Sequence, residues 1–177
     1  CDYGALSVQH GVPSSVDPNR TKSCVDLHVM VDEAKVPIPA AVVMVYPPLN
    51  MDVHPSMSRV LNVGDPLLPL GVLLALGRSY DIQHGSGVAD YLKQPLLTPL
   101  SILRKFPPTF FMVGGYDPFL DDSVNWHMRI AAAGAPTRLH IYPDLSHGFL
   151  SFSKLVPAAR PALRDLDRYL AEQFQRA

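Results

Sequence analysis

The chain has few cysteines: Cys1 and Cys24 are the two among its 177 residues. Two cysteines cannot build a disulfide framework, and neither belongs to a Cys-x-x-Cys pair or to a Cys/His cluster with the spacing of metal ligands. We therefore expect neither a metal site nor a cofactor. A low cysteine count without such pairs is typical of a reducing compartment, so the sequence predicts a cytoplasmic protein, with association with lipid left open.

The sequence also lacks an excess of charge and a long apolar run. Its 15 Lys and Arg against 16 Asp and Glu give a formal net charge of -1. Since no basic cluster occurs, we expect no nucleic-acid partner. The longest apolar stretch, residues 65–77, is interrupted by proline and glycine and is too short to cross a bilayer. With 47% hydrophobic residues, the chain should form one globular domain with a sizeable core and no transmembrane segment.

Three short apolar runs have the composition of buried strands. Residues 40–46 are rich in β-branched side chains without alternation, which is typical of a strand buried on both faces of a parallel sheet. Residues 109–113 form a second such run between two prolines and two glycines. Residues 137–142 alternate more, which favours a place nearer the edge of the sheet. These runs predict the α/β class, with a mostly parallel sheet flanked by helices.

Helical patterns alternate with these strands. One helix follows Asp121 and Asp122, either of which could cap its N-terminus, and Gly134 suits its C-terminal end. Because this helix joins two predicted strands, it should form a right-handed parallel crossover. A last helix spans residues 158–175 and has one apolar stripe. Another helix should begin after Asp65, which suits the cap position ahead of a proline in the first turn.

The chain divides into an irregular beginning and a longer ordered part. Residues 1–23 show no periodicity, and a short helix with Ser23 as its cap is expected after them. Residues 24–177 hold the predicted sheet and helices. Within this part, residues 50–106 form a long, proline-rich insertion that resembles a lid or pocket wall. Its residues 67–76 could be a core helix or the wall of an acyl-chain pocket, and their place in an insertion favours the pocket.

Two loops that follow neighbouring predicted strands carry an acid and a base. Asp117 follows the strand at residues 109–113, and His147 follows the strand at residues 137–142. The carboxyl ends of parallel strands meet at one rim of a sheet, so we expect the two side chains to meet there. A carboxylate can accept the imidazole Nδ1–H and orient the ring, which leaves Nε2 to deprotonate a serine. The order Asp before His is that of the α/β-hydrolases.

Each of these residues also has a simpler structural interpretation. Asp117 alone could be a turn residue ahead of proline, and His147 alone could be a loop histidine beside glycine. Their joint placement favours a catalytic pair. For Asp121 and Asp122, the helix that follows favours capping over a carboxylate pair for metal or acid–base chemistry.

Other polar and aromatic side chains are interpreted as structural. His127 and His140 have no second ligand at matching spacing, so we expect them to be structural or surface residues. The large apolar side chains of the second strand and of the helix after it should lie in the core: Phe110, Phe111, Met112 and Trp126.

Two strings near the end of the chain resemble a known family. Gly-Tyr-Asp-Pro-Phe-Leu-Asp-Asp-Ser at residues 115–123 and Asp-Leu-Ser-His-Gly-Phe-Leu-Ser-Phe at residues 144–152 resemble the paired C-terminal signature of the hormone-sensitive-lipase group. Residues 36–47 and 58–69 resemble that group as well, so that the resemblance covers roughly residues 24–177. It implies a partial α/β-hydrolase fold and a lipase or esterase acting on an ester or lipid substrate, with Asp117 and His147 as the acid and the base of its triad.

The family's nucleophile has no recognisable counterpart in this sequence. The family has Gly-Asp-Ser-Ala-Gly on a sharp elbow and a His-Gly-Gly-Gly oxyanion loop, and neither string occurs here. Counting back by the family's spacing, with Cys24 matching a family cysteine, places the nucleophile near Pro18. Proline has no hydroxyl and a fixed φ, so it cannot replace the serine. The nearby serines lack the elbow's context and are rejected as nucleophiles: Ser7, Ser14, Ser15 and Ser23.

Two hypotheses remain open at this point. The chain could be part of a carboxylic-ester or acylglycerol hydrolase whose serine lies elsewhere, and it would then have little or no activity alone. Alternatively, it could be a non-catalytic α/β protein that binds a lipid-like ligand or a partner chain. If the amino-terminal strands of a hydrolase are missing, residues 41–45 have an unpaired apolar edge, and the chain should aggregate or depend on the missing portion or a partner chain.

Overall fold

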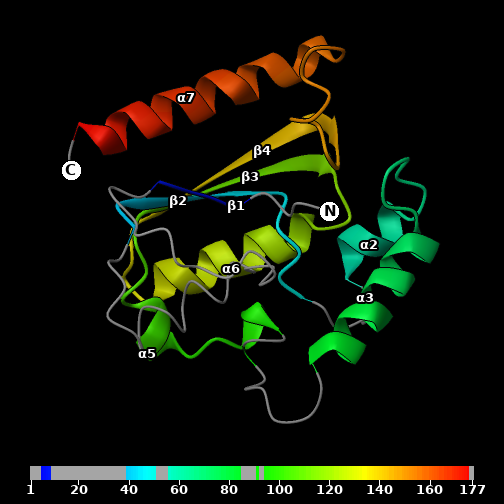
Figure 1. Ribbon diagram of the computed structural model, residues 1–177, viewed down its shortest axis with the longest axis horizontal. Helices are drawn as coiled ribbons and strands as arrows, with labels where there is room; N and C mark the ends of the chain where they lie inside the picture. The colour runs from blue at the N-terminus through cyan, green and yellow to red at the C-terminus, as the bar shows by residue number, and fades with distance from the viewer. Residues whose placement is uncertain (1–4, 9–38, 51–55, 85–90, 92–93, 176–177) are drawn as a thin grey trace.

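A computed structural model describes residues 5–8, 39–50, 56–84, 91 and 94–175 of the chain (Figure 1). Within these residues the sheet has four strands in the order β1-β2-β3-β4. β2 pairs with β3 in parallel, and β3 pairs with β4 in parallel, whereas β1 pairs with β2 antiparallel. The mostly parallel sheet predicted from the sequence is therefore confirmed. The strands are β1 (Ala5–Val8), β2 (Ala41–Val45), β3 (Thr109–Tyr116) and β4 (Thr137–Ser146).

Two helices cover the two faces of this sheet. α6 (Leu120–Ala132) lies on one face and α7 (Arg160–Phe174) on the other, which makes three layers (Figure 1). α6 ends as predicted, because Gly134 follows the C-terminal residue Ala133 with a φ of 83°, a conformation that suits glycine. Short helical turns connect the layers: η1 (Pro95–Leu97), α5 (Leu100–Leu103) and η2 (Pro157–Ala159).

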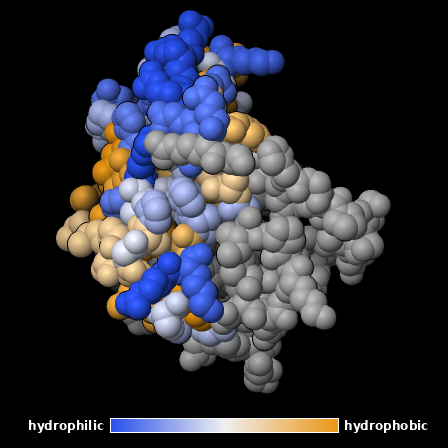
Figure 2. Space-filling model, turned by 90° about the vertical axis from the view of Figure 1, so that its left-hand side faces the viewer, coloured by the Kyte–Doolittle hydropathy of each residue, from blue (hydrophilic) through white to orange (hydrophobic). Residues whose placement is uncertain are grey.

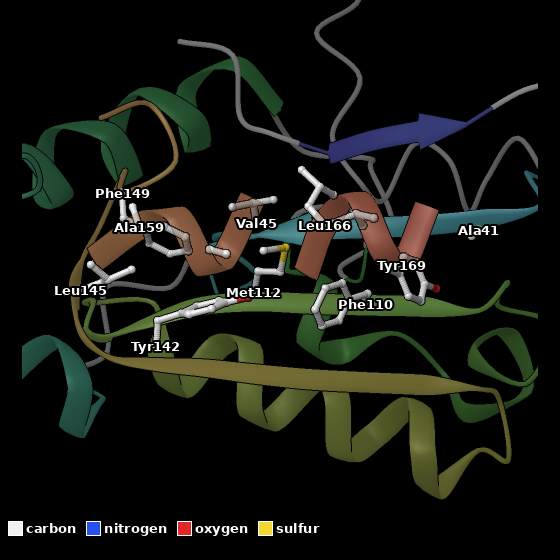
Figure 3. Packing of buried hydrophobic residues seen from close by; sticks show 12 residues of the cluster. Ala41, Val45, Phe110, Met112, Tyr142, Leu145, Phe149, Ala159, Leu166 and Tyr169 are labelled. Carbon is white, nitrogen blue, oxygen red and sulfur yellow. The ribbon is translucent and has the colours of Figure 1, made fainter. Parts of the chain in front are cut away.

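The core lies in two layers, one on each face of the sheet. Alternate residues of β2 face opposite sides: Val43 packs under α7, and Val42 and Met44 pack under α6. All five residues of β2 are buried, which confirms a strand covered on both faces. Figure 3 shows the layer under α7, where Met112 and Phe110 of β3 point toward the helix. The layer under α6 holds Phe111 and Trp126, which confirms the predicted core residues.

β3 and β4 approach each other closely at the rim where their loops begin. β3 continues through Gly114 and Gly115, beyond the end expected from the sequence, and the pairing shifts register there. A Cβ on Gly114 would lie 2.2 Å from the Leu145 carbonyl oxygen, and one on Gly115 would lie 2.5 Å from the Pro143 carbonyl oxygen. Both positions therefore require glycine, since a side chain would push the two strands apart.

The beginning of the chain differs from the sequence prediction. Residues 5–8 were expected to be irregular, but they form β1, which pairs Ala5 with Met44 and Val8 with Ala41. The predicted unpaired edge at residues 41–45 is therefore wrong for the described part of the chain, because backbone hydrogen bonding from β1 satisfies it. The helix expected after Ser23 lies outside the described residues. The division at residue 23 stays a prediction.

Two helices stand at the rim, beyond the carboxyl ends of β3 and β4: α2 (Met57–Leu61) and α3 (Leu70–His84) (Figure 1). α3 begins at Leu70 and not directly after Asp65, so the predicted capping role of Asp65 is wrong. Much of this segment is exposed and apolar, and the core-helix interpretation of residues 67–76 does not hold, because Leu67, Leu70 and Val72 are exposed.

The outer surface of α7 is hydrophilic. On the face that Figure 2 shows, hydrophilic side chains gather at the top, where α7 lies, and hydrophobic side chains lie below them. This matches the sequence of α7, which places its apolar stripe on the sheet and its charges outside. Within the described ranges, no helix combines the length and the hydropathy that a bilayer crossing requires.

Candidate active site

Asp117 lies one residue beyond the end of β3, in the turn that leads into α6. Its Oδ1 accepts a hydrogen bond from the Phe119 backbone N–H at 2.8 Å, and its own carbonyl accepts one from the Leu120 N–H at 3.0 Å. The residue is fully buried. Asp117 is therefore a turn residue, as the simpler interpretation held, and its second carboxylate oxygen still faces the rim.

His147 follows β4 and meets Asp117 at this rim. Its Nδ1 lies 3.0 Å from Oδ2 and 3.2 Å from Oδ1 of Asp117, across 30 residues of sequence. The imidazole side chain is 13% exposed, and the carboxylate side chain is 0% exposed. The structure thus brings together the two residues that the sequence analysis paired. With Nδ1–H donated to the carboxylate, Nε2 is the atom on the far side of the ring and can act as a base.

Two aromatic rings hold the imidazole from other sides. The Tyr46 ring lies 4.6 Å from it, tilted by 60°, and the Phe119 ring meets it edge-on at 5.4 Å. Tyr46 directly follows β2 and has a φ of 40°, a backbone conformation that non-glycine residues rarely adopt. Strained residues of this kind cluster at functional sites. Sequence reasoning missed Tyr46, because a single aromatic residue at a strand end carries no distinctive pattern.

Burial dominates the electrostatics of the acid. It raises the pKa of Asp117 above its usual value, while the hydrogen bond and the charge of His147 lower it and the nearby carboxylate of Asp65 raises it. A buried carboxylate needs a hydrogen-bonded partner, because leaving it unpaired is costly. His147 supplies that partner, so each residue of the pair depends on the other for its place. Burial also raises the pKa of the Tyr46 hydroxyl.

A second carboxylate approaches His147 from the backbone side. Asp65 is 6% exposed, and its Oδ2 accepts a hydrogen bond from the His147 backbone N–H at 3.1 Å. Its Oδ1 accepts from the Leu67 and Leu68 N–H groups, both at 2.8 Å. The sequence analysis missed this contact. A usable signal existed, since Asp65 and Arg59 are the two charged residues in an otherwise uncharged stretch, residues 56–77.

Asp122 does not cap α6. It attaches residues 56–84, the rim segment, to the sheet domain, which is formed by the strands with α6 and α7. Its Oδ2 accepts hydrogen bonds from the Leu49 N–H at 3.0 Å and the Asn50 N–H at 2.9 Å. The Arg59 guanidinium lies 3.0 Å from the same oxygen, with both side chains almost fully buried. The predicted capping role of Asp122 is therefore wrong, because its carboxylate points away from the helix N-terminus toward a segment more than sixty residues earlier.

The first turn of α6 is capped by a serine from that same distant segment. The Ser58 Oγ accepts from the Asp121 N–H at 3.2 Å and donates to the Pro118 carbonyl at 2.8 Å. In return, Asp121 Oδ2 accepts from the Ser58 N–H at 2.8 Å. The helix itself has Phe119 at its N-cap without a side-chain cap bond. Capping of the α6 N-terminus by Asp121 was thus wrong, since Ser58 satisfies the N–H group that a local cap would take.

The remaining candidates lie apart from the rim pair. His127 Nδ1 lies 3.0 Å from the Thr137 hydroxyl, and His140 is half-exposed and stacks on Tyr142 with ring centroids 4.3 Å apart. In the described part of the chain, no three His, Cys, Asp or Glu side chains come together as metal ligands. Ser7 lies in β1 and pairs with Val42 of β2, so it does not lie in a strand-to-helix elbow. The other expected positions lie outside the described residues: Pro18, Cys24, Ser14, Ser15 and Ser23.

Comparison with known sequences identifies the family of the fold. A family model described as the alpha/beta hydrolase fold matches residues 24–151. Esterase LipI of Mycobacterium tuberculosis is 32% identical over 111 residues, which are 61% of this chain and 32% of LipI. The hormone-sensitive lipase of Mus musculus is 43% identical over 75 residues, which are 42% of this chain and 10% of that lipase. The matched part of this chain therefore spans a third or less of the length of these relatives.

Solved structures give a similar result. EstE1, a thermostable carboxylesterase cloned from a metagenomic library, is 30% identical with a TM-score of 0.60, over 68% of this chain and 40% of that one. Carboxyl esterase 2 of Tuber melanosporum has a TM-score of 0.73 at 18% identity, over 83% of this chain and 48% of that one, and shows the fold alone. The chain thus spans less than half the length of these esterases.

Proposed function

This chain belongs to the α/β-hydrolase fold family and is hormone-sensitive-lipase-like, and we propose that it carries the acid and the base of a serine carboxylic-ester hydrolase. Asp117 is the acid and His147 is the base. The observation that supports these roles is the 3.0 Å contact between His147 Nδ1 and a fully buried carboxylate at the rim of a parallel sheet. Relatives named as esterases and lipases make a carboxylic ester or an acylglycerol the proposed substrate class.

The proposed reaction uses His147 as a proton carrier. Its Nε2 takes the proton from a serine hydroxyl as the serine oxygen attacks the ester carbonyl, and it then gives that proton to the departing alkoxide. Asp117 accepts the Nδ1–H throughout and stabilises the imidazolium formed between the two transfers. A water molecule repeats the sequence on the acyl-enzyme and restores the serine. Burial of the carboxylate strengthens its interaction with the imidazolium, because little water screens it.

The serine and the oxyanion donors come from outside these residues in this proposal. The 177-residue sequence has no Gly-x-Ser-x-Gly string and no His-Gly-Gly-Gly string. Without a nucleophile, the chain alone should show little or no ester turnover. The cytoplasmic location and any association with lipid remain proposals drawn from the sequence.

An ester assay on matched proteins tests the proposal. The 177-residue chain and a longer polypeptide of the same gene that carries Gly-x-Ser-x-Gly are compared with p-nitrophenyl butyrate as substrate. We expect turnover from the longer protein only, with a loss of about 10⁴-fold in kcat for Asp117→Asn and a loss at least as large for His147→Ala. His140→Ala is the matched control, since its Nδ1 also lies near a carboxylate, 3.4 Å from Asp165, and it does not contact Asp117.

A fluorophosphonate probe, which labels activated serines, gives an independent reading. No labelling of the 177-residue chain and strong labelling of the longer protein are expected. Labelling of the short chain that disappears in His147→Ala would mean that it holds a nucleophile of its own, and would contradict the proposal that the serine lies elsewhere.

A non-catalytic binding protein is the second candidate. It is favoured by the missing elbow string and by the apolar side chains exposed on both rim helices, such as Met57 on α2 and Leu70 on α3. Absence of Gly-x-Ser-x-Gly from the whole reading frame, together with a monodisperse 177-residue protein, would select it. Dependence of this chain on a further portion or a partner chain is proposed because it spans less than half of the solved esterases.

A further inference from the structure

One carboxylate ties the rim segment to the loop of the proposed base. Asp65 closes its own turn through Oδ1, which accepts from the Leu67 and Leu68 N–H groups. Its Oδ2 reaches 82 residues along the chain and accepts from the His147 backbone N–H. Both oxygens are thus engaged by backbone donors, and the side chain is buried. The turn uses Oδ1 alone, so the hydrogen bond from the His147 N–H to Oδ2 is a separate contact between distant segments.

A packing contact joins the same two segments. Gly148 follows His147 with a φ of 74°, and a Cβ built on it would lie 2.6 Å from Leu67 Cδ1. The backbone conformation and the space both require glycine here. Residues 65 and 67 of the rim segment therefore contact residues 147 and 148 of the loop, one by a hydrogen bond and one by close packing.

We propose that Asp65 is a positioning residue for His147, so that the orientation of the imidazole depends on how residues 65–68 are seated against the rim. Asp117 restrains the ring through Nδ1, and Asp65 restrains the backbone from which the ring extends. Both are required because the direction of a side chain follows from its backbone as well as from its own torsions. The inference rests on the proposed function only in that a triad base needs a fixed orientation.

Asp65→Asn tests the coupling. An amide offers one acceptor oxygen, so its NH₂ group must face either the two turn donors or the His147 donor. The turn holds the oxygen with two bonds, and the His147 N–H loses its acceptor. We expect hydrogen exchange of the His147 amide to accelerate about tenfold. Carbethoxylation of the His147 imidazole by diethyl pyrocarbonate, measured by mass spectrometry relative to His140, should rise severalfold. Asp144→Asn, at an exposed aspartate near the end of β4 and three residues before His147, is the matched control and should change neither.

Asp65→Ser separates a local effect from a general loss of structure. A serine hydroxyl can still accept within the turn, but it is too short to reach the His147 N–H. Faster exchange confined to His147 and its neighbours in this variant supports the proposal. Exchange that is unchanged at His147, or that accelerates equally throughout β3 and β4, overturns it. Neither readout requires turnover, so absence of ester hydrolysis in the longer polypeptide would refute the proposed function and leave this test intact.

Discussion

The sheet domain and the rim segment differ in which side chains fill their interiors. In the sheet domain, formed by the strands with α6 and α7, the interior is built mainly from apolar side chains such as Phe111 and Ile130, and the buried carboxylate of Asp122 pairs with the rim segment. In the rim segment, residues 56–84, the two charged residues of the stretch up to residue 77, Arg59 and Asp65, are buried, while Leu61 is 72% exposed. The first region is held by removal of apolar surface from water, and the second is attached by a few buried polar contacts.

Those contacts are concentrated on the loops that form the candidate site. Ser58 and Arg59 bind the start of α6, five residues or fewer from Asp117, and Asp65 binds the loop of His147. The rim segment can therefore move as a unit only if these bonds break. Substitutions in the two regions should accordingly differ in size and in pH dependence.

The largest effect is expected in the sheet domain. Phe111→Ala should lower the free energy of unfolding by about 3–5 kcal/mol, because it leaves a cavity between β3 and α6. Denaturant unfolding measures the loss. Phe152→Ala, at a phenylalanine that is 40% exposed, is the matched control and should cost far less. Equal losses for the two variants would show that the layer under α6 is not the main source of stability.

Arg59→Met should have the next largest effect and should depend on pH. It leaves the Asp122 carboxylate buried without its cation, which costs about 3 kcal/mol at pH 8. At pH 5 the loss should be smaller, because the carboxyl group then takes up a proton. Arg138→Met, which removes an exposed ion pair with Glu172, should change stability by about 0.5 kcal/mol at either pH. A loss for Arg59→Met that is independent of pH would contradict this account.

The wild-type protein should itself lose stability as the pH rises from about 4 to about 6. Burial raises the pKa of Asp122 to about 6 from its usual 3.8, since desolvation outweighs the attraction of Arg59. In that range the folded protein binds a proton that the unfolded chain has released, so the free energy of unfolding falls as pH rises, by on the order of 2–3 kcal/mol. The raised pKa of Asp117 acts in the same direction. Asp122→Asn should flatten much of this slope, and an unchanged slope would refute the assignment to Asp122.

The smallest effect is expected on the exposed face of the rim segment. Leu61→Gln removes an apolar side chain that is 72% exposed at the end of α2. Its free energy of unfolding should stay within about 0.5 kcal/mol of wild type. A loss above 1 kcal/mol would mean that this side chain packs against something in solution, and would remove the contrast between the two regions.

The two regions also differ in how well the sequence predicted them. The runs at residues 40–46 and 109–113 gave β2 and the first part of β3, and Gly134 gave the end of α6, because apolar composition and glycine act locally. The rim segment was predicted less well. α3 starts four residues later than expected, since Asp65 is held by the His147 loop and not by a helix. Asp121 and Asp122 were assigned to capping because their partners are too distant in sequence to be recognised.

By itself, the sequence determined the class of fold and the two residues that meet at the rim. Strand composition, chain order and the positions of Asp117 and His147 just after two parallel strands are local properties, and parallel strands bring their ends to one edge. Only the tertiary structure decided which buried charges pair, where Tyr46 and Asp65 contact His147, and which side of the rim segment faces water. These depend on contacts between residues about 60 to 100 positions apart, and nothing near a carboxylate in the sequence indicates which distant donor it will bind.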